Sequence, residues 1–343
     1  MKKLLSLTLI CICVLSAFAH EAEEKSLQPI QLSLAYPIGT AGVNSPNYAN
    51  RISINMIYGV NGGVDGIVLG GFANVNKGSV NGVQLSGALN VNTESSHGVL
   101  GSGFANITLL DASGIQMAGY ANYSGQTRGL MMSGFMNRSE NMDGGQLAGT
   151  LNIAEDVDGI QASGLMNIAK SVKGMQIAPL INIADTSDYC IGLINIIKSG
   201  EKGVGGTVDE TNTTMLSFRS GGRVMYGIVG AGYVLDDEFN HLALEAGLGA
   251  ILFQPKKVRL RLELVNTTYE IGDRDTYFKS TLRIMPSFAT SHFEFMAAPT
   301  LNFVYSDQDN TYEAVDNYLW KDNNDNSFNG LYIGFTAGIN YRF

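Results

Sequence analysis

One short motif, repeated nine times between Gly66 and Asn195, constrains this chain more than any other feature. A copy consists of glycine, an apolar residue, glutamine or an apolar residue, another apolar residue, a small residue, glycine, two mostly apolar residues and asparagine. Repetition at a spacing of 13–16 residues predicts units that stack on their neighbours. The closing asparagines are Asn74, Asn90, Asn106, Asn122, Asn137, Asn152, Asn167, Asn182 and Asn195.

Within a copy, apolar and polar residues alternate as they do along a β-strand. Val83 and Leu85 point to one side, and Gln84 and Ser86 point to the other. Because one copy cannot bury its apolar side alone, we expect about nine coils of a parallel β-solenoid, ~4.8 Å apart, that bury this side by stacking. The asparagines are then expected to form a structural ladder of side-chain amides. A row of ligand-binding amides is the alternative use of these positions.

A rival architecture also fits the alternation. The copies would then be strands of a membrane barrel, with their apolar side against lipid. Glycine and alanine are frequent at the positions that would face lipid, and near-identical copies suit stacking better than a meander. We therefore favour the solenoid over this alternative.

The first residues have the composition of a secretory signal peptide. Two lysines precede an apolar run over residues 4–18, and residues 17–19 form a cleavage site of the A-x-A type. Cleavage after Ala19 leaves Cys190 as the only cysteine, which excludes a disulfide framework within the exported chain. The formal net charge of −9 argues against a nucleic-acid partner.

The pattern changes at Arg223, from which six longer alternating runs follow. Charged residues such as Arg261 and Glu263 alternate there with apolar residues such as Leu260 and Leu262. An apolar exterior around a charged interior is typical of outer-membrane barrels, whose strands need ~9–11 residues to cross a bilayer. We expect the interior charges to form a structural network of ion pairs, and they are Glu245, Arg259, Arg261, Glu263, Lys279, Arg283 and Glu294.

The C-terminus carries a second export feature. Gly338, Tyr341 and Phe343 form a pattern of glycine, two residues, an aromatic residue, one residue and a terminal aromatic residue. This pattern resembles the C-terminal β-signal that the outer-membrane barrel assembly machinery reads. It predicts an exported protein of the cell outer membrane, with outer-membrane lipid and the assembly machinery as partners.

Two alternating runs precede the repeats, at residues 28–38 and 51–58. Added to the six later runs, they give an antiparallel barrel of about eight strands, and an even number is typical of such barrels. With this count the repeats emerge on the periplasmic side of the barrel. A further strand at 204–221, or the absence of a strand at 51–58, would place them outside.

The predicted fold is therefore all-β, a repeat β-solenoid combined with an outer-membrane β-barrel. The expected segments are a signal peptide at 1–19, the first barrel strands at 20–58, the solenoid repeats at 59–202, a linker at 203–222 and the C-terminal barrel strands at 223–343.

Catalytic and metal-binding motifs are not apparent in the sequence. The four histidines, at positions 20, 97, 241 and 292, lack the spacing of metal ligands and do not accompany a nucleophile motif. We expect no cofactor, no bound metal and no enzymatic activity.

The repeat over residues 82–91, with the preceding stretch at 55–66, resembles the surface-repeat-containing protein family of Gram-negative bacteria. The resemblance covers roughly residues 50–200. It implies an exported protein of the cell envelope and brings no known activity or catalytic residue. Copies with Val68, Leu100 or Met131 at the glutamine position depart from the pattern, which weakens a binding role for that glutamine.

These observations favour a non-enzymatic outer-membrane protein, a barrel anchor that presents the repeats to an unknown surface or periplasmic ligand or that serves envelope structure. Two alternatives stay open. The barrel could be a small-solute pore or transport component, and the solenoid could be a glycan-acting enzyme, although no pair of acidic residues stands out for that chemistry.

Overall fold

The computed structural model describes residues 26–235, 241–255, 257–271, 275–306, 315–324 and 327–343. The predicted signal peptide at 1–19 lies outside these residues. The chain divides into two compact units, residues 1–162 and 163–343. Apart from one 3-10 helix, η1 (Gly42–Asn47), every regular element in the described ranges is a β-strand. No helix among the described residues is long and apolar enough to cross a membrane.

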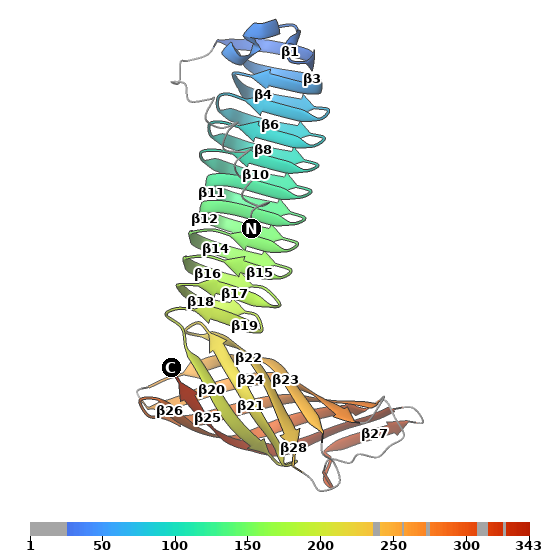
Figure 1. Cartoon of the computed structure of the whole chain (residues 1–343), viewed down its shortest axis with the longest axis vertical. Helices are drawn as coiled ribbons and strands as arrows, with labels where there is room; N and C mark the ends of the chain where they lie inside the picture. The colour runs from blue at the N-terminus through green and yellow to red at the C-terminus, as the bar shows by residue number, and fades with distance from the viewer. Residues whose placement is uncertain (1–25, 236–240, 256, 272–274, 307–314, 325–326) are drawn as a thin grey trace, which may run out of the picture. The chain divides into compact units, whose positions relative to one another are not determined.

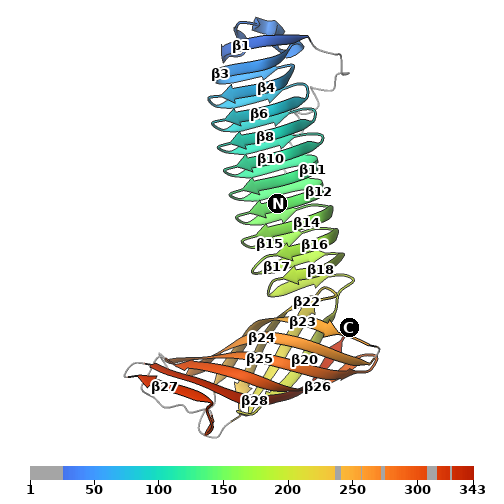
Figure 2. The ribbon, with the colours of Figure 1, turned by 180° about the vertical axis from the view of Figure 1, so that it is seen from behind.

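The architecture is a parallel β-solenoid of about ten turns followed by a closed antiparallel barrel of eight strands, which confirms the predicted fold class. Figures 1 and 2 show the solenoid strands of each unit stacked one above the next. Copies of the repeat pair in register, so that Gly82 lies beside Gly98 and Asn90 beside Asn106. This parallel pairing excludes the rival in which the copies are barrel strands.

Each coil of the first unit contributes to two walls, which we call the first wall and the second wall. The first wall contains the strand that carries the glutamine position, as in β6, and the second contains the strand that carries the ladder asparagine, as in β7. The strands of this unit are β1 (Leu27–Ala35), β2 (Ile38–Gly39), β3 (Ala49–Asn61), β4 (Gly63–Gly70), β5 (Ala73–Asn76), β6 (Val80–Ser86), β7 (Leu89–Asn92), β8 (Ser96–Ser102), β9 (Ala105–Thr108), β10 (Ala112–Ala118), β11 (Ala121–Ser133), β12 (Met136–Ala148), β13 (Leu151–Ile153) and β14 (Asp156–Ser163).

Helix η1 closes the first coil of the solenoid. The Ser45 hydroxyl is buried and donates hydrogen bonds to the Gln31 side chain and to the Val60 carbonyl oxygen. Nδ2 of Asn50 donates to Oε1 of Gln31 at 3.0 Å. The polar interior of the first coil is therefore covered by polar groups rather than left open.

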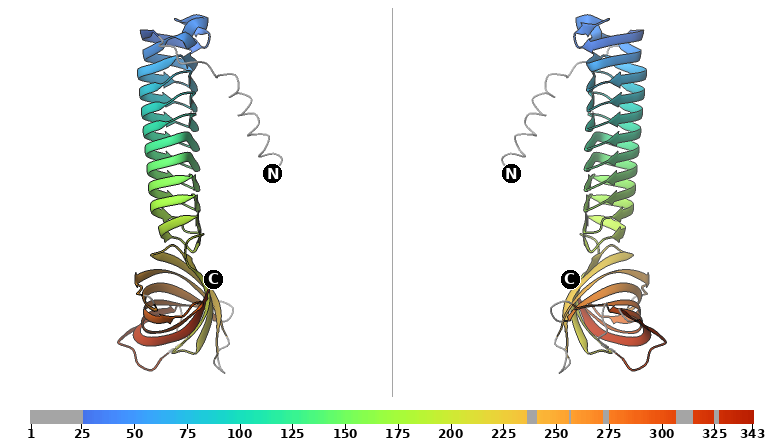
Figure 3. Two further views of the ribbon diagram at one scale, coloured as in Figure 1. Left: turned by 90° about the vertical axis from the view of Figure 1, so that its left-hand side faces the viewer. Right: turned by 90° about the vertical axis from the view of Figure 1, so that its right-hand side faces the viewer.

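The second unit contains the last coils and the barrel. Figure 3 shows its later strands curving into a ring, which closes where Val204 pairs with Tyr341. The coil strands are β15 (Met166–Ile168), β16 (Ser171–Ile177), β17 (Ile181–Ala184), β18 (Thr186–Ile191) and β19 (Ile194–Ile197). The barrel strands are β20 (Lys202–Asp209), β21 (Thr213–Gly221), β22 (Met225–Val234), β23 (Leu242–Phe253), β24 (Val258–Ile271), β25 (Asp275–Ala289), β26 (Phe293–Ser306) and β28 (Ser327–Arg342), and β27 (Trp320–Asn324) pairs with β28 outside the ring.

The assignment of strands to the barrel differs from the prediction. The runs at 28–38 and 51–58 belong to the solenoid, because Ile30 of β1 pairs in parallel with Ile52 of β3. The predicted linker at 203–222 instead forms β20 and β21, the first two barrel strands. Two-residue alternation is the same in a coil strand and in a barrel strand, so the pattern could not identify the pairing partner.

The orientation of the repeats is also opposite to the prediction. Gln84 and Asn90 are fully buried, whereas the side chain of Leu85 is 42% exposed. The apolar side therefore faces outward and the amides fill the interior. This is stable because the amides bond one another and the backbone: Nδ2 of Asn90 donates to Oδ1 of Asn106 and to the carbonyl oxygen of Gly101, each at 2.8 Å.

Glycine at the start of the motif is required by close stacking. Gly82 has a φ of 129°, and a Cβ atom there would lie 2.0 Å from the carbonyl oxygen of Gly66 in the neighbouring coil. Both the backbone conformation and the contact exclude other residues.

Candidate functional site

The nine closing asparagines lie inside the solenoid, and each is fully buried. In the first unit Asn74 donates to Asn90 at 3.0 Å, and the series continues from Asn106 to Asn122 at 2.9 Å. In the second unit Asn182 donates to Asn195 at 2.9 Å. Because these amides bond one another and do not reach the surface, their geometry is that of a structural ladder rather than a ligand row.

The solenoid contains a second asparagine series, which the sequence analysis did not identify. Asn61 donates to Asn76 at 2.9 Å, and Asn76 donates to Asn92 at 2.8 Å. At the next coil Thr108 takes the asparagine position and accepts from Asn92 at 3.4 Å. Its signal was the Asn-x-Asn pairs at residues 74–76 and 90–92, in which both asparagines point inward.

The glutamine position forms a third interior column of mixed composition. Val68, Gln84, Leu100, Gln116 and Met131 pair in register in successive coils. Both amide atoms of Gln84 and of Gln116 are buried, and neither atom has a hydrogen-bond partner among the described residues. Their neighbours in the column, Val68, Leu100 and Met131, carry no amide, so these two glutamines have no amide beside them to bond.

The barrel interior is filled by ion pairs. Glu263 is fully buried, and its carboxylate accepts from Nε of Arg219 at 2.9 Å and from the Tyr226 hydroxyl at 2.8 Å. Arg283 lies 3.5 Å from the same carboxylate and pairs with Glu245 at 2.5 Å. Two carboxylates thus compensate two guanidinium groups within one cluster.

A second cluster lies at the barrel end where the chain enters. Arg261 pairs with Glu294 at 2.7 Å, and Arg259 pairs with Glu201 at 2.7 Å. The seven interior charges expected from the sequence are all buried and lie in these clusters or, for Lys279, in a pair with Asp209 at 2.5 Å. Glu201, Asp209 and Arg219 were missed, because they lie in or beside the segment that was taken for a linker.

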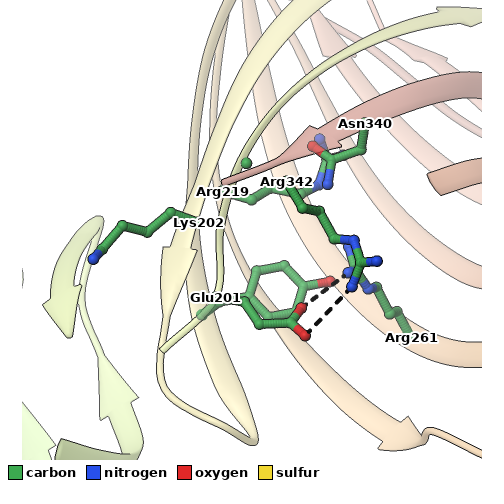
Figure 4. Close-up of a pocket in the computed structure, with 8 residues that line it drawn as sticks. Glu201, Lys202, Arg219, Arg261, Asn340 and Arg342 are labelled. Carbon is green, nitrogen blue, oxygen red and sulfur yellow. Dashed lines mark hydrogen bonds and ion pairs between the residues drawn. The ribbon is translucent and has the colours of Figure 1, made fainter. Parts of the chain in front are cut away.

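The entry end of the barrel has little free volume. A pocket of about 10 Å³ is lined by Arg219, Tyr226 and Asn340, among others. Figure 4 shows Arg261 and Arg342 directed toward Glu201, at 3.4 and 3.9 Å, while Lys202 points away. A space of this size holds about one water molecule, so it is too small for a solute.

The outer surface of the barrel is apolar. Exposed and buried residues alternate along all of β26, and its exposed residues include Phe293, Phe295 and Phe303. Near the C-terminus the Phe293 and Tyr341 rings meet edge to face with centroids 5.4 Å apart. The predicted β-signal lies at this end: Tyr341 and Phe343 are exposed, and Gly338 approaches β20 so closely that a Cβ atom would lie 2.3 Å from the carbonyl oxygen of Gly206.

Within the second unit, the last coil meets the barrel through polar contacts. Arg223, in the turn between β21 and β22, pairs with Asp188 at 2.9 Å, and this hydrogen bond raises the pKa of its guanidinium. Asn195 ends its series by donating to the carbonyl oxygen of Ser220 at 3.2 Å. Sγ of Cys190 is buried and accepts from the Gly222 amide at 3.0 Å. Burial raises the pKa of the Cys190 thiol to about 11, so the thiol is unreactive near neutral pH.

The outward side chains of the first wall form a surface that we call the outer apolar face. It comprises two columns across β3, β4, β6, β8, β10, β11 and β12, and neither column contains a polar residue. Most of its large side chains are 36–44% exposed. The columns are Ile52, Ile67, Val83, Val99, Ile115, Leu130 and Gly145, and Ile54, Leu69, Leu85, Gly101, Met117, Met132 and Leu147.

A third outward column, the border column, runs beside this face and is polar. It begins at Arg51, which lies opposite the Asp65–Gly66 pair, because Asn50 pairs with Val64 and Ile52 with Ile67. All its members are exposed except Ser113, which is half-buried. In chain order the column is Arg51, Asp65, Asn81, His97, Ser113, Arg128 and Asp143.

No family model matches this chain, and comparisons with curated proteins and with solved structures found no match. In the ranges that the structure describes, no group of three or more His, Cys, Asp or Glu residues is arranged to hold a metal ion. The features with a functional geometry are therefore the apolar barrel exterior, the charge-filled barrel interior and the outer apolar face of the solenoid.

Proposed function

We propose that this protein is a non-enzymatic outer-membrane protein, in which the barrel is a lipid-embedded anchor that carries the solenoid into the periplasm. The main observation behind this proposal is that the barrel has apolar residues outside and charged residues inside. Exposed aromatic and aliphatic residues surround an interior of buried ion pairs. Such an arrangement suits a hydrocarbon environment outside and needs internal pairing of every charge. Outer-membrane lipid and the barrel assembly machinery are the proposed partners.

Strand length supports insertion in a bilayer. Strands β24 and β26 have 14 residues each, and β28 has 16. Tilted strands of ~9–11 residues are enough to cross the hydrocarbon layer. The exposed Phe288, Phe293, Phe295 and Tyr341 gather near the C-terminal end of the barrel, where an aromatic girdle would meet the lipid headgroups.

The filled interior supports an anchor rather than a pore. The buried clusters around Glu263 and Glu294 occupy the barrel, and the pocket at its entry end has a volume of about 10 Å³. Small barrels of about eight strands have interiors that side chains fill. We expect no ion conductance when the purified chain is reconstituted in planar bilayers.

The connections support a periplasmic solenoid. At the barrel end where β20 begins and β28 finishes, turns join β21 to β22, β23 to β24 and β25 to β26, whereas the longest stretch of chain between neighbouring barrel strands, which contains β27, joins β26 to β28 at the other end. Outer-membrane barrels have short periplasmic turns and longer external loops. Since eight strands follow the solenoid, the chain enters the barrel at the end with the short turns.

Cell fractionation tests the proposal. The protein should remain in the outer-membrane fraction after an alkaline carbonate wash, and unheated samples should migrate faster than boiled samples on SDS gels. Phe343→Ala should reduce assembly if the β-signal is read, while Phe253→Ala, an exposed aromatic residue elsewhere on the barrel, should assemble normally. Recovery of the wild-type protein in the soluble fraction would refute the barrel anchor.

A further inference from the structure

The outer apolar face is as large as the exposed apolar patches that mark interaction sites. It spans seven coil strands, from β3 to β12, so at ~4.8 Å per coil it is ~30 Å long. Its two columns occupy a width of about four residues, so its area is on the order of 400 Å². Contiguous apolar patches of more than a few hundred Å² mark interaction sites.

Nothing inside the solenoid requires this face to be apolar. The coils are held by backbone pairing and by the buried amide series, as in the bonds of Asn90 to Asn106 and Gly101. Polar side chains at outward positions would be compatible with the same stacking, as the border column shows at Asn81, His97 and Arg128. The uniform apolarity of the two columns of the outer apolar face therefore indicates a partner that covers them.

We propose that the partner is a second copy of this chain, packed face to face and antiparallel about a two-fold axis through β8. The axis runs along the strand direction, so each column of one copy lies over the same column of the other. In this arrangement β3 lies over β12 of the second copy, β4 over β11, and β6 over β10.

The border column supports this register through its charges. Arg51 of one copy lies over Asp143 of the other, and Asp65 lies over Arg128. The polar residues Asn81 and Ser113 face each other. Opposite charges across an interface fix its register, and like charges disfavour the wrong ones.

Neighbouring registers lack this complementarity. A shift by one coil in one direction brings Asp65 over Asp143, and a shift in the other direction brings Arg51 over Arg128. In a parallel pairing, with the two-fold axis along the stack of coils, the border columns of the two copies would not face each other, so their charges could not pair across the interface. The antiparallel register centred on β8 is the one that pairs both arginines with aspartates.

The apolar columns also fit in size. Ile52, a large residue, lies over Gly145, and Leu85 lies over Met117 of the other copy. At the axis Val99 faces Val99, and Gly101 faces Gly101, where small residues allow close approach. With the border column included, each copy would cover an area on the order of 500 Å², about 1,000 Å² for the pair, which reaches the lower limit for a specific interface.

Site-directed cross-linking in isolated cell envelopes tests the arrangement, in a Cys190→Ala background. His97→Cys lies at the axis, so a bismaleimide that spans the ~10 Å between packed sheets should join two identical chains. Arg128→Cys alone should not cross-link, because its symmetry mate lies four coils away, ~19 Å along the face. Co-expression of Asp65→Cys and Arg128→Cys chains with different tags should give a cross-link between unlike chains.

Charge reversal gives an independent readout on the full chain in mild detergent. Asp65→Lys should weaken the dimer about tenfold, because it places a lysine over Arg128, which lies 3.6 Å from Asp143 of its own chain. Asp65→Asn removes the charge pair without adding a repulsion, so it should weaken the dimer less. Faster migration of unheated samples on SDS gels shows that each variant has a folded barrel. The proposal is overturned if the wild-type chain is monomeric and His97→Cys gives no cross-link, or if Arg128→Cys cross-links to itself as well as His97→Cys does.

Lipid is the other occupant that this test can reveal. A monomeric protein in which Leu85→Cys is protected from a water-soluble maleimide only by vesicles of phosphatidylethanolamine and phosphatidylglycerol would assign the face to lipid. That result would also overturn the proposal, while leaving the outer-membrane anchor unaffected.

Discussion

Nε2 of Gln161 donates a hydrogen bond to Oε1 of Gln146 at 2.8 Å, in the interior column where Gln84 and Gln116 have no partner among the described residues. The difference lies in the neighbouring coils. Gln146 and Gln161 are adjacent in the column, whereas Gln84 lies between Val68 and Leu100. An amide in such a column is satisfied when the next coil also has an amide.

Leucine substitutions at two of these glutamines should therefore change stability in opposite directions. Gln84→Leu removes a buried amide without partners, so it should raise the free energy of unfolding by about 1–2 kcal/mol. Gln161→Leu leaves the side-chain Oε1 of Gln146 unpaired, so it should lower the free energy of unfolding by about 1–3 kcal/mol. Urea unfolding of the solenoid, followed by circular dichroism, measures both. Equal destabilisation by the two substitutions would contradict the proposed role of the neighbours.

The asparagine ladder should be more sensitive than the glutamine column. Asn106 donates to the carbonyl oxygen of Met117 at 2.7 Å and to Asn122 at 2.9 Å, and it accepts from Asn90 at 2.8 Å. Asn106→Leu should lower the free energy of unfolding by about 2–4 kcal/mol, because it removes three buried hydrogen bonds. Asn81→Leu, at an exposed position of the first wall, is the control and should change the free energy of unfolding by less than about 0.5 kcal/mol.

The ion-pair network predicts a strong effect inside the barrel. Glu263→Gln leaves Arg219 and Arg283 with one carboxylate fewer between them, so it should lower the free energy of unfolding by about 3–5 kcal/mol. The temperature at which unheated protein converts to the slower-migrating form on SDS gels should fall accordingly. Asp188→Asn, which breaks the solvent-exposed pair with Arg223, should leave this temperature nearly unchanged.

Because the Cys190 thiol is buried, we expect the stability of the protein to depend on pH above neutrality. Burial raises the pKa of Cys190 from 9.0 to about 11, so the folded state favours the protonated thiol. Its contribution to stability is complete below pH 9 and is lost as the pH rises through about 11. Wild-type protein should lose stability in this window relative to Cys190→Ala. Parallel curves for the two proteins between pH 9 and 11 would contradict the shift.

The sequence was sufficient to predict the two architectures, because each leaves a periodic pattern. The repeat spacing requires equivalent residues in successive coils to stack, and the charged residues that alternate with Leu260 and Leu262 require a polar interior. The asparagine series followed from the same spacing. The seven expected barrel charges lie inside for this reason as well.

The predictions that were wrong concern features that depend on tertiary context. Alternation in β6 defines two sides but not which is inside, and Leu85 was placed wrongly because buried amides are stable only as a bonded series. The strands β1 and β20 were misassigned because a coil strand and a barrel strand share one period. In β20 the pattern is also interrupted by Gly205 and Gly206, so Val204 and Val208 did not stand out.

Accessibility of single cysteines in intact cells tests the proposed topology most directly. In a Cys190→Ala background, Asp156→Cys presents a thiol at the exposed start of β14 in the solenoid, and Lys321→Cys presents one in β27, at the barrel end with the longer connections. A membrane-impermeant maleimide should label Lys321→Cys in intact cells and Asp156→Cys only after the outer membrane is opened. Labelling of Asp156→Cys in intact cells, with Lys321→Cys protected, would contradict the periplasmic solenoid.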